Sequence, residues 1–277
     1  MKKQAIIFCL GLLASFSIQA QVTSMTSKNG HEILPQEGDY CISMDAVPLV
    51  NMAMNAINIM NDSGNNGVHP NYVSGFEQTI VGKMYTSATT ADRIRLNINH
   101  RNMSMSTFAP TFDDNGEENG ETEDVEINRS TQLLFGYGKE MRRGHNRLQG
   151  FYGYEGMLAI GMGANKFDYE SELAEEVTRT LSAKQGFEFG LGVRGFVGAE
   201  YFFAPKMSIG AEFGWGLGIS RTGRGSLETE TNTGGDIETT ETDGAASERE
   251  WGFEVDNGIG SSLLGGGTAA LTLNLHF

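Results

Sequence analysis

The feature that most constrains the fold is an alternation of residue types over residues 187–219. From Phe187 to Phe203 the odd positions are mostly apolar or aromatic, and the even positions carry mainly glycine, Glu and Arg. After "APK" the alternation resumes and continues from Met207 to Ile219. A period of two residues is typical of β-strands, whose successive side chains point to opposite faces. These residues predict two long antiparallel strands joined by a short turn.

The length and the faces of these strands indicate their surroundings. Each is longer than the five or six residues usual in soluble proteins and long enough for the roughly nine to eleven that a tilted membrane strand needs. One face is apolar and aromatic, and the other combines glycine with charge, as expected when apolar residues face lipid and polar residues face the lumen. The predicted fold class is all-β, an eight-stranded antiparallel up-and-down transmembrane β-barrel. The lipid-facing aromatic side chains are predicted to be Phe189, Tyr201, Phe203, Phe213 and Trp215.

The other six strands are predicted from weaker signals of the same kind. A slip of the alternation near His100–Arg101 predicts a β-bulge. The segments are Tyr40–Val47, Phe76–Tyr85, Arg93–Met105, Gln132–Lys139, Leu148–Gly163 and Thr268–Phe277.

The predicted connections alternate in length. Those after strands two, four and six are short, and those after strands one, three, five and seven are long, at about 48–75, 107–129, 165–185 and 220–265. Short periplasmic turns and long extracellular loops are the layout of outer-membrane barrels. An even number of strands also places both termini in the periplasm.

The last predicted strand supports this layout. In "LTLNLHF", residues 271–277, leucine and Phe277 alternate with Thr, Asn and His. Such a strand presents leucines to lipid and closes the sheet against the first strand. Leu273, Leu275 and Phe277 lie on the same side of this strand.

The N-terminal residues predict export. Residues 1–20 have a short basic start, an apolar stretch from Ala5 to Phe16 and a small residue, Ala20, before the expected cleavage point, which is the pattern of a secretory signal peptide. Residues 21–37 are then a periplasmic segment and 38–277 the barrel domain. Removing residues 1–20 changes the net charge from −15 to −17 and leaves Cys41 as the only cysteine, so no internal disulfide is expected. The rest of the chain has no uninterrupted apolar run of eighteen residues, so no transmembrane helix is predicted.

The long connections contain most of the acidic residues of the chain. Residues 113–126, 168–176 and 228–250 hold 21 of the 35 Asp and Glu residues. Charge runs of this kind are usually solvated, and "DDNGEENGETED" lacks the spacing of an EF-hand calcium loop. The expected metal and cofactor content is none, and nucleic acid is excluded as a partner because the loops would repel it.

Residues 48–60 differ from the other connections. Asn51, Asn55 and Asn58 recur at helical spacing after Pro48, which suits a first helical position. We expect a short amphipathic helix at the barrel mouth; the alternative is that the first strand continues.

Four segments also resemble a known family. "GDYCISMDAVPLVNM" (38–52), "GFYGYEGMLAIG" (150–161), "GAEYFFAPKMSIGAEFGWG" (198–216) and the terminal "LTLNLHF" resemble small eight-stranded outer-membrane β-barrel proteins of Bacteroidota-type Gram-negative bacteria. The resemblance covers most of the barrel wall and almost none of the acidic loops. It implies a small closed barrel whose last strand ends in a signal that the barrel-assembly machinery reads, here Leu273, Leu275 and the terminal aromatic Phe277. It brings no catalytic residues.

The alternation also predicts which charges face the lumen. Four are basic and five acidic, so they nearly neutralise one another, and an eight-stranded barrel is only wide enough for its side chains to fill it. We expect a salt-bridge core; the alternative is a narrow ion path or gate. The residues are Asp45, Lys83, Arg93, Arg95, Glu155, Glu188, Arg194, Glu200 and Glu212.

The expected function is therefore non-enzymatic. The protein is predicted to be an integral outer-membrane protein that acts through extracellular loops or as a subunit of an envelope assembly, with outer-membrane lipid and lipopolysaccharide, the assembly machinery and other envelope proteins as partners. The alternatives are transport through the charged lumen, and a lipid- or peptide-modifying enzyme using His69 or His100 at the rim. No Gly-x-Ser-x-Gly motif is present.

Overall fold

The structure is a computed structural model that describes residues 25–46, 79–112, 118–244, 247–255 and 270–277. These residues form twelve strands and no helix. The predicted signal peptide and the predicted helix at 48–60 lie outside the described residues. No helix among the described residues is long and apolar enough to cross a membrane. The strands are β1 (Tyr40–Asp45), β2 (Thr79–Ser87), β3 (Thr90–Phe112), β4 (Glu118–His145), β5 (Leu148–Asp168), β6 (Thr178–Lys184), β7 (Glu188–Ala204), β8 (Met207–Thr222), β9 (Ser226–Thr233), β10 (Asp236–Asp243), β11 (Glu248–Val255) and β12 (Ala270–His276).

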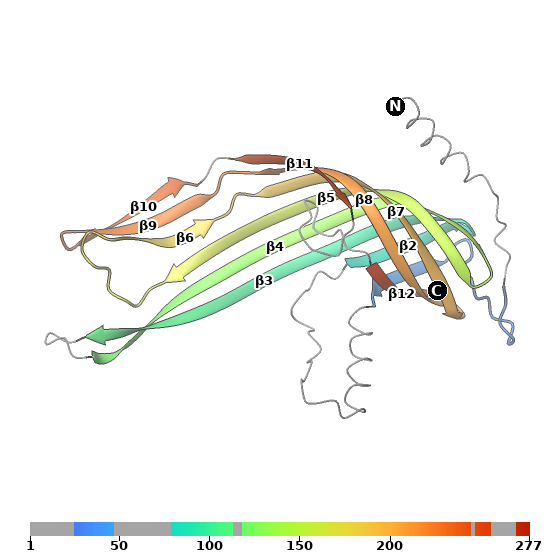
Figure 1. Ribbon diagram of the computed structural model, residues 1–277, viewed down its shortest axis with the longest axis horizontal. Helices are drawn as coiled ribbons and strands as arrows, with labels where there is room; N and C mark the ends of the chain where they lie inside the picture. The colour runs from blue at the N-terminus through green and yellow to red at the C-terminus, as the bar shows by residue number, and fades with distance from the viewer. Residues whose placement is uncertain (1–24, 47–78, 113–117, 245–246, 256–269) are drawn as a thin grey trace, which may run out of the picture.

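Eight of the strands form a closed antiparallel ring (Figure 1). Its order is β1-β2-β3-β4-β5-β7-β8-β12, and β12 pairs again with β1. Successive ring strands are adjacent, as expected when short turns join antiparallel neighbours. The prediction of an all-β antiparallel fold whose last strand closes on the first is confirmed.

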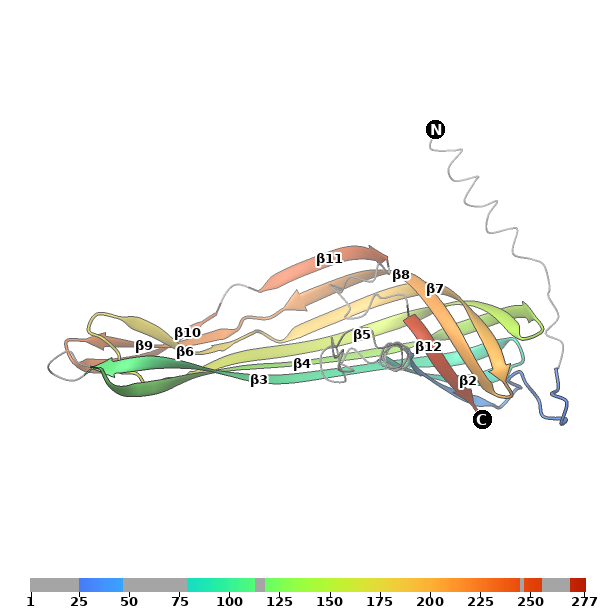
Figure 2. The same ribbon diagram turned by 60° about the horizontal axis from the view of Figure 1, so that its bottom comes forward.

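A second part of the sheet continues beyond the ring. β3, β4 and β5 are 23, 28 and 21 residues long, and their far ends carry β6, β9 and β10 in the order β4-β5-β6-β9-β10. We call this part the extension; it forms the left-hand half of the molecule in Figures 1 and 2. The opposite end of the ring, where Tyr40 and Phe277 lie, is called the terminal end.

The extension corrects the prediction of long loops at 107–129, 165–185 and 220–265. Most of these residues are strands, namely the ends of β3 and β4 and all of β6, β9, β10 and β11. In β9 threonine alternates with Glu or Asn, and β10 contains three more threonines after Gly234 and Gly235, both of which have positive φ. Threonine is β-branched and favours strands, and two glycines suit a tight hairpin turn. These strands were predicted as loops because their many acidic residues are typical of solvated connections.

The predicted bulge near His100–Arg101 is wrong. β3 pairs with β4 without a break from Thr90 to Thr111, and the only register shift falls between Thr111 and Phe112. β2 pairs with β3 only as far as Asn97. Beyond that point β3 belongs to the extension, where both faces are exposed. The residue types stop alternating there because no face is buried, although the strand continues.

Candidate functional site

The interior of the ring is filled by charged side chains. Five bases and four acids are buried there, each with 0–6% of its surface exposed. The bases are Lys83, Arg93, Arg95, Arg142 and Arg194, and the acids are Glu140, Glu155, Glu200 and Glu212. Buried charges are costly unless they are paired and hydrogen-bonded. Their nearly equal numbers allow them to satisfy one another.

The central cluster joins three arginines to two glutamates. Arg95 contacts Glu155 at 2.8 Å and Glu212 at 2.9 Å, and Arg194 contacts the same two residues at 3.0 and 2.8 Å. Arg93 reaches Glu212 at 2.6 Å. Planar guanidinium groups can each serve two carboxylates. The cluster therefore ties β3, β5, β7 and β8 together across the interior.

A second cluster lies toward the terminal end. Glu200 accepts short hydrogen bonds from Arg142 and Ser208, and its Oε1 lies 3.0 Å from Nε2 of His276. Glu140 bridges the two clusters, because it lies 3.3 Å from Arg93 and 3.9 Å from Arg142; it also pairs with Lys83 at 2.9 Å. Ion pairs thus follow one another along the length of the interior.

The Ser208, His276 and Glu200 set does not have the geometry of a catalytic triad. Ser208 Oγ lies 3.4 Å from Nε2 of His276, the same nitrogen that faces Glu200. A triad uses one ring nitrogen for the nucleophile and the other for the acid. All three side chains are also buried. Among the described residues, no group of three or more His, Cys, Asp or Glu is arranged to hold a metal ion.

Glycines on the inner face make room for these long side chains. A Cβ at Gly214 would clash with the guanidinium of Arg194, and one at Gly153 would lie 2.5 Å from the ring of Phe196. Phe196 in turn packs under Arg93, whose guanidinium carbon is 4.2 Å from the ring centroid. The glycine positions therefore match the large side chains across the interior, which is how close packing is reached.

Seven of the nine predicted lumen residues belong to this interior. They are Lys83, Arg93, Arg95, Glu155, Arg194, Glu200 and Glu212. Glu188 lies half-buried where the extension begins, and only the backbone of Asp45, paired with Thr272, is described.

Sequence reasoning missed Glu140, Arg142 and His276. Glu140 and Arg142 were missed because the predicted fourth strand ends at Lys139, which leaves both residues in the short connection that follows it. β4 in fact continues to His145. Continuing the even-position alternation past Gly138 would have placed both residues inside.

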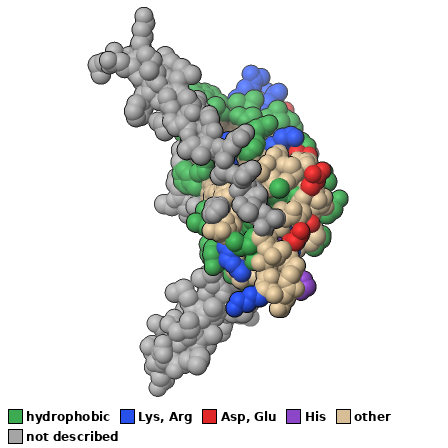
Figure 3. All heavy atoms as spheres, turned by 90° about the vertical axis from the view of Figure 1, so that its right-hand side faces the viewer, with side chains coloured by type: hydrophobic (Ala, Val, Ile, Leu, Met, Phe, Trp, Pro, Cys, Tyr) green, Lys and Arg blue, Asp and Glu red, His purple; other side chains and the backbone are tan. Residues whose placement is uncertain are grey.

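The outer face of the ring has the opposite polarity. Large apolar side chains on it are 37–61% exposed, among them Leu96, Ile94, Phe135, Leu191, Val193, Ile209, Leu217 and Ile219. The five aromatic residues Phe189, Tyr201, Phe203, Phe213 and Trp215 are all exposed on this face. On β12 Leu273 and Leu275 are partly exposed and Phe277 is exposed. Figure 3, viewed from the terminal end, shows hydrophobic side chains along several sides of the outline.

An N-terminal segment packs against the terminal end. Ile33 and Leu34 are fully buried against Phe202, with Met25 packed beside them. The backbone N–H of Lys206 donates to the carbonyl of Ile33 at 3.2 Å, and the Lys206 ammonium pairs with Asp39. These contacts cover the terminal end of the interior with apolar side chains.

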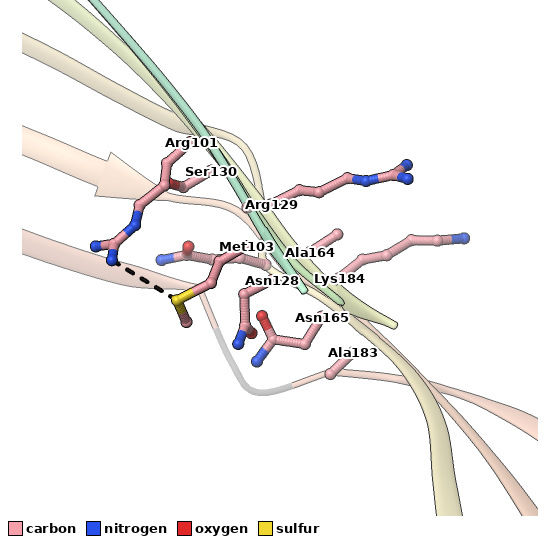
Figure 4. A pocket seen from close by; sticks show the side chains of 11 residues that line it. Arg101, Met103, Asn128, Arg129, Ser130, Ala164, Asn165, Ala183 and Lys184 are labelled. Atoms are coloured by element: carbon pink, nitrogen blue, oxygen red, sulfur yellow. Dashed lines mark hydrogen bonds between the residues drawn. The ribbon is translucent and has the colours of Figure 1, made fainter. Parts of the chain in front are cut away.

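A polar pocket opens where the interior charges end and the extension begins. It has a volume of about 500 Å³. Figure 4 shows Arg101, Met103, Asn128 and Asn165 on one side of the sheet, whereas Arg129 and Lys184 point away on the other. Arg101 donates a 3.7 Å hydrogen bond to the sulfur of Met103. Amide and guanidinium groups of this kind suit a polar ligand. We call it the mouth pocket.

The acidic segment 168–176, between β5 and β6, has defined contacts. Asp124 accepts hydrogen bonds from the backbone N–H groups of Glu170 and Ser171, both at 3.0 Å, and from the Ser171 hydroxyl at 2.8 Å. Arg179 donates to the Ser171 carbonyl at 2.7 Å and lies 4.3 Å from the ring of Tyr169. The segment is therefore held against the extension by specific hydrogen bonds.

Comparison with protein-family models, with curated proteins and with solved structures found no match for this chain. Function is therefore inferred from geometry and chemistry.

Proposed function

We propose that this protein is an integral outer-membrane protein, exported by its N-terminal signal peptide, and that the ring of eight strands is a transmembrane β-barrel with a closed lumen. The observation that carries the proposal is the polarity of the ring: charges are buried inside and large apolar side chains are exposed outside. A soluble monomer rarely exposes a contiguous apolar surface of this extent. In lipid the same surface is favourable, since a barrel places apolar residues outward and polar residues inward.

Strand length is consistent with this environment. The ring strands β7 and β8 have 17 and 16 residues, more than the roughly nine to eleven that a tilted strand needs to cross a bilayer. Closure of the ring pairs the strand edges, which lipid requires because it offers backbone groups no hydrogen bonds. In the proposed orientation the terminal end faces the periplasm and the extension faces the outside of the cell.

The proposed activity is binding. The ion pairs along the interior and the apolar contacts at the terminal end leave a filled barrel, consistent with the small diameter of eight strands. The mouth pocket and the polar surface of the extension then meet the external medium. The protein is proposed to act through these surfaces or as a subunit of an envelope assembly.

A conductance measurement separates this function from transport through the lumen. Protein refolded into planar bilayers is expected to give no conductance steps, and the variants Arg194→Gln and Glu212→Gln are expected to give none either. Steps in the unmodified protein whose size changes in these variants would favour the channel. Insertion is scored independently by fractionation with the outer membrane and by a folded band that shifts on heating.

A partner search tests the two forms of the binding role. An affinity tag inserted in the exposed turn at residues 28–30 allows gentle extraction and capture from native outer membrane. A stoichiometric companion would make the protein an assembly subunit. A lone monomer would direct attention to the mouth pocket and to soluble ligands outside the cell.

A further inference from the structure

An outward-facing groove crosses β7, β8 and β11. Its volume is about 400 Å³, and its apolar wall consists of Phe189, Leu191, Ile219 and Trp251. These four side chains are 41–79% exposed. Trp251 and Ile219 are directly opposite each other in the register between β11 and β8. The groove is therefore an apolar strip with an aromatic side chain at each edge.

Two arginines lie at one end of this strip. Arg221 of β8 and Arg249 of β11 are directly opposite each other in the register. Strand alternation places both on the same outward face as Ile219 and Trp251. Directly opposed like charges in neighbouring strands destabilise a sheet. Neither arginine forms an ion pair with another residue in the described parts of the chain.

Among the described residues that line the groove, Glu250 is the only acid. It pairs with Ser220 and so alternates to the inner face of the strand, away from Arg221 and Arg249. On the neighbouring strand β7, the residue directly opposite Arg221 is Phe189. The outward end of the groove thus carries two positive charges and an aromatic ring, with no acid facing them from β7, β8 or β11.

The two arginines lie at the depth where lipid headgroups begin when the ring spans the membrane; this step rests on the proposed function. The apolar outward residues of β8 run from Met207 to Ile219, twelve positions apart. A strand of that length spans the apolar band of about 25 Å in an outer-membrane barrel. Arg221 follows Ile219 by two residues, at the end of the ring opposite the termini. The arginine pair therefore falls at the outer boundary of the apolar band.

We propose that Arg221 and Arg249 bind a phosphate of an outer-leaflet glycolipid whose acyl chains lie along Phe189, Leu191, Ile219 and Trp251. Guanidinium groups form bidentate, charge-assisted hydrogen bonds with phosphate. Two arginines that repel each other are stabilised by one dianion between them. The indole of Trp251 suits the boundary between acyl chains and headgroups.

The test uses Trp251 as a reporter at the groove. Trp215 and Trp251 are the only tryptophans of the chain, so Trp215→Phe leaves Trp251 as the single fluorophore. This variant is reconstituted in vesicles of dibrominated phosphatidylcholine, whose acyl chains quench tryptophan. Phosphorylated lipid A, its dephosphorylated form or phosphatidylglycerol is then added as a minor component in separate experiments.

The expected result is that phosphorylated lipid A restores Trp251 fluorescence at a low mole fraction by excluding brominated lipid from the groove. In the same background Arg221→Gln/Arg249→Gln is expected to need at least about tenfold more lipid A, since charge-assisted hydrogen bonds are strong and tenfold in affinity corresponds to about 1.4 kcal/mol. The matched control is Arg224→Gln, which removes an exposed arginine that pairs with Asp243 at 3.7 Å; it should bind as before.

Three outcomes would overturn the inference: equal protection by the dephosphorylated lipid, equal protection by phosphatidylglycerol, or an unchanged requirement in the double variant. These outcomes are distinguishable from failure of the proposed function. Quenching of Trp251 by brominated lipid alone already shows that the groove contacts acyl chains, whereas a tryptophan that brominated lipid does not quench would count against the membrane proposal itself.

Discussion

Tyr40 and Phe277 exchange both of their backbone hydrogen bonds, each at 2.9 Å, and their side chains stack with ring centroids 6.3 Å apart. This pair joins the first and last strands of the ring at its terminal end. The hydrogen bonds belong to the backbone and do not depend on the side chains. The aromatic stack is an additional contribution that substitution can remove alone.

Replacement of Phe277 by alanine tests this contribution. The free energy of unfolding in vesicles is expected to fall by about 1 kcal/mol, as for other aromatic pairs. In cells the heat-modifiable folded form is expected to fall by a larger factor than this loss explains, if Phe277 also serves the assembly machinery. The control is Phe253→Ala, an equally exposed aromatic residue on β11 outside the ring. Equal folded yields for the two variants would contradict the assembly role.

The second prediction concerns Glu212, which contacts Arg93, Arg95 and Arg194. Glu212→Gln leaves three buried guanidinium groups short of one negative charge. Breaking a buried pair from one side costs about 3–5 kcal/mol, so urea unfolding should move to a clearly lower midpoint. Glu188→Gln removes a half-buried acid where the extension begins and should change stability by less than about 0.5 kcal/mol. A Glu212 variant as stable as the Glu188 variant would mean that the cluster is hydrated.

The third prediction concerns the space that glycines leave on the inner face. A Cβ at Gly198 would clash with the ring of Phe151 and lie 2.5 Å from the carbonyl oxygen of Ala211. The backbone of a paired strand cannot move easily to relieve this clash. Gly198→Ala is therefore expected to lower the free energy of unfolding by about 1–3 kcal/mol, as overpacking usually does. Gly82 has no atom within 4 Å of the same position. Gly82→Ala should therefore be neutral or slightly stabilising in the same unfolding assay.

The fourth prediction concerns Asp124, which holds the acidic segment 168–176. Desolvation, the largest single influence, raises the pKa of Asp124, but the hydrogen bonds from Ser171 and Glu170, together with the positive charge of Arg179, outweigh it and hold the pKa below its usual value. Because the pKa is lowered in the folded state, the contact stabilises the segment above about pH 4 and is lost as the pH falls through the lowered value. Protection of the Glu170 and Ser171 amides from hydrogen exchange should follow this dependence.

Substitutions separate the charge of Asp124 from its hydrogen bonds. At pH 7, Asp124→Ala should expose the Glu170 and Ser171 amides to fast exchange. Asp124→Asn keeps one acceptor oxygen and should give intermediate protection. Unchanged protection in the alanine variant would mean that Arg179, which donates to the Ser171 carbonyl at 2.7 Å, fixes the segment alone.

The sequence by itself determined the parts of the fold in which one face of a strand is buried. Between Phe187 and Ile219 the alternation identified β7, β8 and the inward position of Arg194 and Glu212, because the two faces meet different surroundings and select different residues. It also identified β12 as the strand that closes the ring.

Only the tertiary structure decided the extension and the contacts inside the ring. In β9 and β10 both faces are largely polar, so no apolar face marks the strands, and the pairing of β6 with β9 and of β9 with β10 supplies the order. Likewise Glu140, Arg142 and His276 acquire their roles from residues 57 to 76 positions away along the chain, such as Lys83, Glu200 and Tyr85. Alternation assigns a side chain to a face, but its partner depends on the register and closure of the whole ring.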